Sequence, residues 1–224
     1  METQLKKNKK IKNERYNKFL DHQEIELITE AEIQYVINNI QGNHVREARS
    51  LIITLFYTGA RPNEILKIKG KNVIKEDANY LSILVPGSKG GNSRKIFLNY
   101  RKDLIKELYN YVTSIDPERY LFWNFKSIYI RHRLCKKGRN KGKIFKTTEY
   151  SDKLRYHFKK WFSVLPSGNI PPYFLRHNRF TQLASSDIPL ENIRQLKGAK
   201  TMDSVYPYTH FSSKSAKEIA RKMK

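Results

Sequence analysis

Cationic and phenolic residues that can act together on a phosphodiester occur at separated points of the sequence. Arg61, Lys89 and Arg176 are cationic, and the stretch V-Y-P-Y-T-H places Tyr206 and Tyr208 on either side of one proline. If these side chains converge, two guanidinium groups can bind the non-bridging oxygens, the lysine can protonate the leaving oxygen, and a phenol can attack phosphorus. The result would be a phosphoryl-transfer site that works without a metal ion.

Each of these residues also has an ordinary structural role. An arginine at a helix start usually forms an ion pair, a lysine in a hairpin is usually solvated, and a tyrosine usually packs against neighbours. The chemical interpretation therefore depends on whether the fold brings the residues together.

The overall charge of the chain favours a polyanionic partner, nucleic acid first. The 224 residues include 44 Lys and Arg against 21 Asp and Glu, a formal net charge of +23. No apolar run approaches the roughly 20 residues of a membrane-spanning helix, so we expect no membrane partner. We expect the protein to lie in the cytoplasm in association with the nucleoid, or in the host cytoplasm if it is viral. Because Cys135 is the single cysteine, we expect no internal disulfide and no thiolate metal site. Since the phosphoryl-transfer chemistry needs no metal ion, we also expect no metal and no cofactor.

Helical patterns dominate the chain and predict a mainly α fold. The segment T-E-A-E, Thr29 to Glu32, has capping-box spacing, and a second helix over about 45–57 ends at Gly59. Pro62 fits the first position of a further helix, which places Arg61 at a helix-to-helix junction. We also expect helices over about 101–112, 149–162, 175–185 and after Ser215.

One antiparallel hairpin is expected beside these helices. The runs Tyr80 to Val85 and Arg94 to Leu98 are rich in β-branched and aromatic residues. They are joined by P-G-S-K-G-G-N-S, whose glycines permit the positive φ of a hairpin turn. Lys89 is expected near the tip of this hairpin.

Two basic segments are expected to contact nucleic acid. We expect residues 1–28 to form a basic, flexible N-terminal arm, ahead of a single domain over 29–224. The stretch 131–146 holds eight Lys and Arg and no acidic residue, and we expect a flexible loop laid against phosphates, with a plain solvated loop as the alternative. The candidate nucleic-acid-binding residues are Arg94, Arg131, Arg133, Lys136, Lys137, Arg139, Lys141 and Lys143.

Four segments, in order, resemble the tyrosine recombinases of the phage-integrase family. T-G-A-R-P-N-E-I-L-K-I, Thr58 to Ile68, is similar to the family's first arginine segment, and G-S-K-G-G-N-S-R to its lysine hairpin. Y-F-L-R-H-N-R-F-T, Tyr173 to Thr181, resembles its second arginine segment, and P-Y-T-H its terminal tyrosine segment. The resemblance covers about 29–224, the family's catalytic domain with its C-terminal tail helix. It implies a mainly α domain with a small antiparallel hairpin or three-stranded sheet.

The resemblance assigns catalytic roles to Arg61, Lys89 and Arg176. The family's nucleophile follows its L-x-G-H histidine by nine residues, and nine residues after Ala199 is Tyr208. Tyr206 is then expected to be a packing or supporting residue.

Two positions depart from the family pattern. Tyr173 replaces the first histidine of H-x-x-R, as in some archaeal integrases, and its phenol can still donate a hydrogen bond to a phosphate oxygen. Ala199 replaces the L-x-G-H histidine, for which Lys200 or His210 are candidate substitutes. We expect His177 to position Arg176 rather than to act chemically.

The function that the resemblance implies is site-specific breaking and rejoining of double-stranded DNA through a 3′-phosphotyrosyl intermediate, by a dimer or tetramer on DNA. Three alternatives are a catalytically degenerate DNA-binding relative, which Ala199 favours, a type IB topoisomerase, and an RNA-binding protein. Nothing in the sequence resembles an aromatic RNA-stacking platform.

Overall fold

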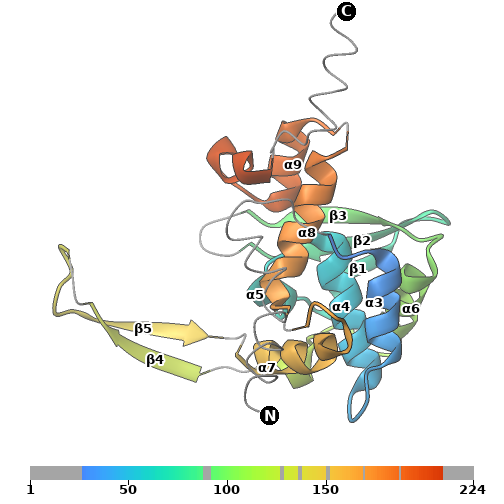
Figure 1. Ribbon diagram of the computed structural model, residues 1–224, viewed down its shortest axis with the longest axis horizontal. Coiled ribbons are helices and arrows are strands. Elements are labelled where there is room, and N and C mark those ends of the chain that lie inside the picture. Colours follow the sequence, from blue (N-terminus) through green and yellow to red (C-terminus); the bar gives the residue numbers. More distant parts are fainter. Residues whose placement is uncertain are drawn as a thin grey trace, which may run out of the picture.

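The computed structural model describes residues 27–87, 92–126, 129–135, 138–149, 152–168, 170–186 and 188–208. Helices form most of the body, a small sheet lies along one side of it, and a two-stranded hairpin projects away from it (Figure 1). The helices are α3 (Glu30–Asn38), α4 (Val45–Thr58), α5 (Pro62–Ile65), α6 (Asp103–Val112), α7 (Asp152–Trp161), α8 (Pro172–Ala184) and α9 (Leu190–Lys197). The strands are β1 (Val73–Lys75), β2 (Tyr80–Val85), β3 (Arg94–Asn99), β4 (Tyr129–Leu134) and β5 (Ile144–Glu149). This mainly α fold with a small antiparallel sheet confirms the expected fold class.

The central element is α4, which packs against α3, α6 and α8. It is buried along most of its length, because its run L-I-I-T-L-F has no polar face. Thr54 and Thr58 remain compatible with burial since each hydroxyl donates to a backbone carbonyl one turn earlier, at 2.7 and 2.6 Å. The helix ends where Gly59 takes the left-handed conformation, with φ +58°. Both the capping box at Thr29 and this glycine stop were predicted, and both are confirmed.

The expected hairpin is the outer part of a three-stranded antiparallel sheet of order β1-β2-β3. Ile83 of β2 pairs with Val73 of β1 and with Ile96 of β3, so these apolar side chains share one row. That face is buried against the helices. A three-stranded sheet was one of the two expected forms, but the position of the third strand, β1, was not predicted. Lys89 lies outside the described residues, as does the rest of the turn between β2 and β3.

The expectation of a loop over 131–146 is wrong. Strands β4 and β5 pair antiparallel along six residues each, from Tyr129 opposite Glu149 to Leu134 opposite Ile144. Gly138 and Gly142, both with positive φ, lie in the connecting loop. The two strand segments, Y-I-R-H-R-L and I-F-K-T-T-E, are rich in β-branched and aromatic residues, which favour strands. The high positive charge of the stretch concealed this signal. Figure 1 shows this hairpin extending away from the helices.

The remaining helices confirm the sequence expectation with shifted starts. Helix α7 begins at Asp152 rather than near Glu149, because Glu149 still belongs to β5. Helix α8 begins at Pro172, since a proline at the first helical position has no amide hydrogen to leave unpaired. The helix expected after Ser215 lies outside the described residues.

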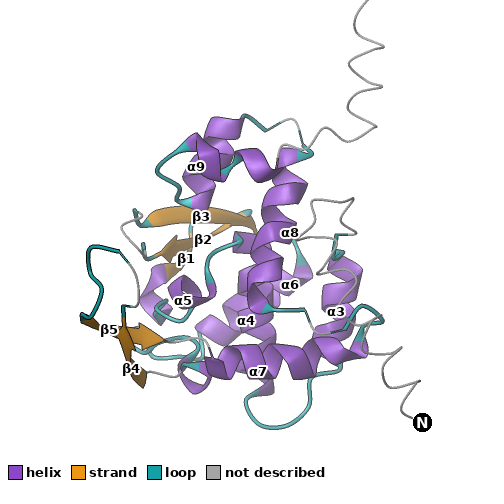
Figure 2. Cartoon of the chain, turned by 60° about the vertical axis from the view of Figure 1, so that its left-hand side comes forward, coloured by secondary structure: helices purple, strands orange, loops and turns teal. Residues whose placement is uncertain are grey.

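Two hydrophobic clusters stabilise the described part of the chain. The larger one joins α3, α4, α6, α7, the first turn of α8 and the sheet. The smaller one joins α8, α9 and the final turn through Phe180, Leu183, Ile193, Val205 and Tyr208. Figure 2 shows α9 standing above β3 at the upper end of α8, with α7 across the lower end of the body. The smaller cluster thus attaches the segment that carries the candidate nucleophile.

Ile28, the last residue of the arm expected from the sequence, is fully buried in the larger cluster. Its amide donates to Oδ1 of Asn178 at 2.7 Å, and its carbonyl accepts from Nδ2 of the same residue at 3.1 Å. The chain therefore enters the described fold against α8. Across the described ranges, every helix is too short or too polar to cross a bilayer.

Candidate active site

The turn between α4 and α5 places Arg61 at the edge of the site. Gly59 ends one helix and Pro62 begins the next, and Arg61 between them has extended backbone, with φ −68° and ψ 143°. Its amide donates to Oε2 of Glu64 at 3.0 Å, and Nη1 donates to Oε1 at 2.7 Å. The Arg61 side chain remains 29% exposed. A short turn thus holds a guanidinium group in place while leaving part of it open.

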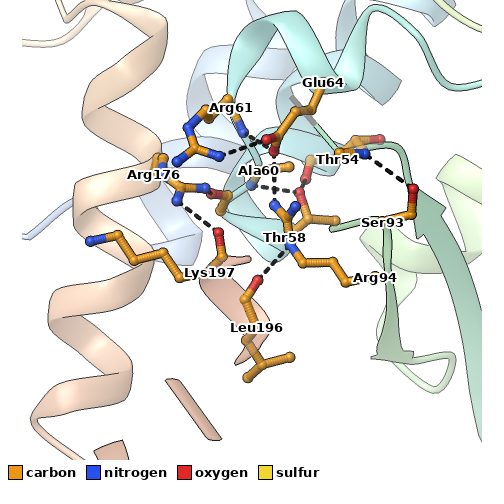
Figure 3. A network of polar contacts seen from close by, with 12 residues as sticks. Thr54, Thr58, Ala60, Arg61, Glu64, Ser93, Arg94, Arg176, Leu196 and Lys197 are labelled. Carbon is orange, nitrogen blue, oxygen red and sulfur yellow. Dashed lines mark hydrogen bonds and ion pairs between the residues drawn. The ribbon is translucent and has the colours of Figure 1, made fainter. Parts of the chain in front are cut away.

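Glu64 is the anchor of this cluster and is fully buried. Besides Arg61 it binds Arg94, whose Nη2 lies 2.8 Å from Oε2 (Figure 3). Burial alone would raise the pKa of Glu64, but hydrogen bonds from Arg94 and Arg61 outweigh it and lower the pKa to about 2. The carboxylate is therefore charged at neutral pH. The sequence motif contained this glutamate, yet its role became visible only through its two partners.

Arg94 lies inside the fold rather than on the surface expected for a DNA contact. Its side chain is 8% exposed, and Nε donates to the carbonyl of Leu196 at 2.7 Å. Arg94, the first residue of β3, thereby joins α5 to the end of α9. Gly198 permits this approach, because a Cβ there would lie 2.8 Å from Nη1 of Arg94.

Arg176, the fifth residue of α8, is fully buried. Nη1 donates to the carbonyl of Gly59 at 2.7 Å and Nη2 to the carbonyl of Lys197 at 3.0 Å. Among the described residues its buried Nε has no hydrogen-bond partner. Burial and the nearby charge of Arg61 lower the pKa of Arg176 to about 10, so it remains cationic at neutral pH. A buried cation whose hydrogen bonds go to backbone carbonyls suits an incoming anion.

Tyr208, in the last described turn, is 7% exposed and packs on Phe180. Its hydroxyl lies 2.8 Å from Nδ1 of His177. Burial, with the positive charges of Arg176 and Lys197, lowers the pKa of His177 to about 3. A neutral imidazole at physiological pH can accept the phenol proton in this hydrogen bond. Burial raises the pKa of Tyr208 itself, although Arg176 opposes the rise.

These contacts change the roles expected for His177 and Tyr206. His177 is hydrogen-bonded to the candidate nucleophile, a contact that the sequence did not indicate. The tyrosine that packs is Tyr208, whereas the Tyr206 side chain is 55% exposed. Tyr173, one turn before His177 on α8, is 45% exposed, and its ring centroid lies 4.8 Å from that of His177. Tyr173 therefore lies at the rim of the site.

The structure gathers four of the predicted catalytic residues, Arg61, Tyr173, Arg176 and Tyr208, where the α4–α5 turn, α8 and the final turn meet. His177, for which a positioning role was expected, lies among them. Lys200 is exposed beyond α9, and His210 lies outside the described residues. Lys197 was not predicted: its ammonium lies 4.5 Å from the ring centroid of Tyr208.

The predicted nucleic-acid-binding residues divide into three groups. Arg139, Lys141 and Lys143 are exposed in the loop of the β4–β5 hairpin. Arg131 and Arg133 lie on β4, and Lys136 and Lys137 lie outside the described residues. In the ranges that the structure describes, no group of three or more His, Cys, Asp or Glu side chains is arranged to hold a metal ion.

Replacing Glu64 by glutamine is expected to lower the free energy of unfolding by about 3–5 kcal/mol, because it leaves the buried guanidinium of Arg94 and the partly exposed guanidinium of Arg61 without a counter-charge. The native pKa of Glu64 lies below its ordinary value of 4.5. Its stabilising effect is therefore present above pH 4.5 and lost as the pH falls toward 2, a loss that the variant should not show. Chemical denaturation across this pH range measures both effects.

Glu107→Gln is the matched control, because Glu107 binds Arg49 on the partly exposed α4–α6 surface, with Oε2 to Nη2 at 2.8 Å. A surface pair contributes about 1 kcal/mol or less. An equal decrease in the free energy of unfolding in the two variants would contradict the anchoring role of Glu64.

Comparison with known proteins concerns the family and the fold of the chain. The sequence matches the phage integrase family over residues 18–215. The fold is similar to that of the XerA recombinase, with a TM-score of 0.55 and 19% identity over 88% of this chain and 62% of that one. It is also similar to the XerH site-specific recombinase bound to its difH substrate, with a TM-score of 0.54 and 21% identity over 85% and 51% of the two chains.

A further similar structure is the Tn1549 transposon integrase in complex with circular intermediate DNA, with a TM-score of 0.57 and 16% identity over 89% and 67% of the chains. The chain spans 62% of XerA and 51% of XerH. At these identities the structural likeness shows a common fold, while the family match extends over most of the sequence. The chain therefore belongs to the phage integrase family of tyrosine recombinases.

Proposed function

We propose that this chain is a site-specific DNA recombinase that cleaves and rejoins strands through a 3′-phosphotyrosyl intermediate. The observation that carries the proposal is a buried tyrosine, Tyr208, hydrogen-bonded to a neutral histidine and bordered by the cations Arg61, Arg176 and Lys197. A nucleophile, a proton acceptor and anion-binding groups thus meet at one place. This arrangement suits attack on a phosphodiester.

The charge of the site supports a phosphodiester substrate. Glu64 balances Arg61 and Arg94, whereas the hydrogen bonds of Arg176 go to the carbonyls of Gly59 and Lys197. A buried charge is costly unless it is compensated. A non-bridging phosphate oxygen would supply that charge and a partner for the Nε of Arg176.

The proposed cleavage step begins when Oη of Tyr208 attacks phosphorus and its proton passes to Nδ1 of His177. The bond between phosphorus and the 5′ oxygen breaks as the bond to Oη forms. The 5′ oxygen leaves as a hydroxyl, with a proton donated by Lys89 as the family resemblance implies. A 5′-hydroxyl of a partner duplex reverses these steps, and the proton on His177 returns to the phenol. The bond energy is retained in the phosphotyrosine, so the cycle balances without ATP.

Arg61 and Arg176 would stabilise the charge that builds on the non-bridging oxygens. Tyr173, exposed at the rim, is placed to donate a hydrogen bond to the same phosphate. Arg94 and Glu64 would hold Arg61 in position from inside the fold. Because rejoining between two duplexes needs two sites at once, we expect a dimer or tetramer on DNA.

Double-stranded DNA is the proposed partner, and the solved XerH and Tn1549 integrase structures are themselves complexes with DNA. The net charge of +23 provides the electrostatic attraction. The β4–β5 hairpin projects from the body with Arg139, Lys141 and Lys143 exposed in its loop (Figure 1). We propose that this loop contacts phosphates beside the cleavage site.

Replacing Arg139, Lys141 and Lys143 together by glutamine is expected to weaken DNA binding and to flatten its salt dependence. Each phosphate contact that is lost lowers the slope of log K against log salt by roughly 0.9, so the slope should fall by up to about 3. Binding to a duplex across a salt series measures the slope. The control replaces Arg101, Lys102 and Lys106, exposed near the start of α6, and removes the same charge. Equal slopes in the two variants would contradict a specific role of the hairpin.

The test of the proposed function uses nicked DNA duplexes of randomised sequence, because strand cleavage beside a nick releases a short fragment and traps the adduct. The chain is incubated with this pool, covalent adducts are recovered under denaturing conditions, and the bound DNA is sequenced. Peptide mapping then identifies the modified residue. We expect one recovered sequence and a phosphotyrosine at Tyr208.

Ala199 favours a second candidate, a DNA-binding relative that does not cleave, because the side chain of alanine cannot donate a hydrogen bond. Salt-sensitive binding of the duplex pool without any adduct would support that candidate and overturn the proposal. An adduct combined with relaxation of supercoiled plasmid, but without rejoining between duplexes, would indicate the topoisomerase alternative.

A further inference from the structure

Lys197, the last residue of α9, has its side chain directed into the candidate site. The residue is 6% exposed, and its Nζ lies 4.5 Å from the ring centroid of Tyr208 and donates to the carbonyl of Ser204. Its own carbonyl accepts from Nη2 of Arg176 at 3.0 Å. One residue therefore contacts both the candidate nucleophile and the buried arginine.

The burial of this ammonium is unusual because, among the described residues, no acidic side chain pairs with it. Lysine is rarely buried unless paired, and within the described ranges Lys197 forms no ion pair. The charges that act on it are those of Arg176 and Arg61, which are also positive. Figure 3 shows the Lys197 side chain on the same side of the cluster as Arg61 and Arg176. Packing alone would be served as well by an apolar side chain of the same length.

The phenol ring of Tyr208 explains the burial. The face of an aromatic ring carries negative potential that attracts a cation, and this attraction increases when the ring is desolvated. Loss of the phenol proton adds a full negative charge, which the ammonium stabilises more strongly still. Lys197 is thus placed to favour the charged, attacking form of Tyr208 over the neutral form.

We propose that Lys197 is a positioning residue that holds the ring of Tyr208 and stabilises its phenolate during attack on the phosphodiester. This inference rests on the proposed function. It also gives the site a cation near the position where Ala199 replaces the family histidine. The candidates considered from sequence were Lys200, which is exposed, and His210, which lies outside the described residues.

In this step Lys197 remains protonated from beginning to end. The phenol proton of Tyr208 moves to Nδ1 of His177, and the negative charge on Oη passes to the non-bridging oxygens as the bond to phosphorus forms. The ammonium therefore changes the energy of the charged nucleophile without gaining or losing a proton.

This mechanism predicts a specific pH dependence. Burial, together with the charges of Arg176 and Arg61, lowers the pKa of Lys197 to about 8, and the other groups that face it are Tyr208 and His177. Since the protonated form is required, the cleavage rate should decline as the pH rises through about 8. Arginine at this position stays charged and should remove the decline.

The experiment measures single-turnover cleavage of the duplex recovered from the randomised pool. Lys197→Met, which keeps length and burial, should cleave about 30-fold more slowly, the rate equivalent of the ammonium stabilising the phenolate by about 2 kcal/mol more than it stabilises the neutral phenol. Its affinity for the duplex should be unchanged. Lys197→Arg should retain most of the rate at neutral pH and show no alkaline decline. Lys159→Met, on the exposed surface of α7, controls for the loss of a lysine elsewhere.

A second measurement separates stabilisation of the phenolate from packing. Fluorotyrosine at position 208 makes the phenol more acidic, so the deficit of Lys197→Met should shrink if Lys197 stabilises the phenolate. An unchanged deficit would indicate packing and overturn the inference, and so would wild-type rates in Lys197→Met. A rate loss in Lys200→Met with none in Lys197→Met would also overturn it. Adduct formation by the wild-type chain is measured first, before any variant is compared. Its absence would refute the proposed function itself.

Discussion

Replacing Tyr208 by phenylalanine is expected to abolish the covalent adduct with nicked DNA. The substitution removes one oxygen, the atom proposed to attack phosphorus, and leaves the ring in its cluster with Phe180 and beside Lys197. The hydrogen bond to His177 is lost, which should cost about 1 kcal/mol of stability. The variant should therefore be folded and should bind DNA. Denaturing electrophoresis of the adduct and a thermal melt check the two parts of this expectation.

Tyr206→Phe is the matched control, because Tyr206 lies two residues earlier in the same short turn, with a side chain that is 55% exposed. It should form the adduct at the wild-type rate. The opposite pattern, with an adduct in Tyr208→Phe and none in Tyr206→Phe, would move the nucleophile to Tyr206. That result would leave His177 without the role assigned to it here.

Replacing Arg176 by alanine is expected to reduce strand cleavage by about 10²- to 10³-fold, the usual effect of removing one donor that stabilises transition-state charge. Duplex binding should persist, since one fully buried guanidinium is a small part of a net charge of +23. Arg176 also joins the carbonyls of Gly59 and Lys197, at 2.7 and 3.0 Å, so the variant should be less stable. Cleavage is therefore measured below the melting temperature of the variant.

Two further variants separate chemistry from folding. Arg176→Lys keeps the charge but lacks the forked guanidinium, so it cannot bind two carbonyls and a phosphate at once, and we expect an intermediate rate. Arg155→Ala removes an exposed arginine of α7 and should cleave normally. Wild-type cleavage by a folded Arg176→Ala variant would remove Arg176 from the proposed mechanism.

Local sequence signals predicted most of the helical framework. The capping box at Thr29, the glycine stop at Gly59 and the proline start at Pro62 act over a few residues, so each was readable without the fold. The β4–β5 hairpin was missed because its strand signal is weak beside a high positive charge. The pairing of Tyr129 with Glu149 joins residues far apart in the chain, which no local pattern reveals.

The role of a site residue could be predicted where the residue belongs to a sequence motif. It could not be predicted where the role depends on a contact between distant segments. Arg61, Arg176 and Tyr208 follow from segments that resemble the family. Glu64 holds Arg94 across 30 positions, and Tyr208 meets His177 across 31. Such contacts depend on how helices pack, so the roles of Glu64 and His177 emerged only from the structure.

By itself the sequence determined the helical character of the chain, its family and its strong positive charge, because these depend on residue types and short spacings. The tertiary structure alone decided that Arg94 is an internal brace, that Tyr208 rather than Tyr206 is buried, and that Lys197 lies against the phenol ring. Burial removes water from these groups, and their pKa values and partners then follow from the neighbours that remain. Those neighbours come from distant segments, and folding alone brings them together.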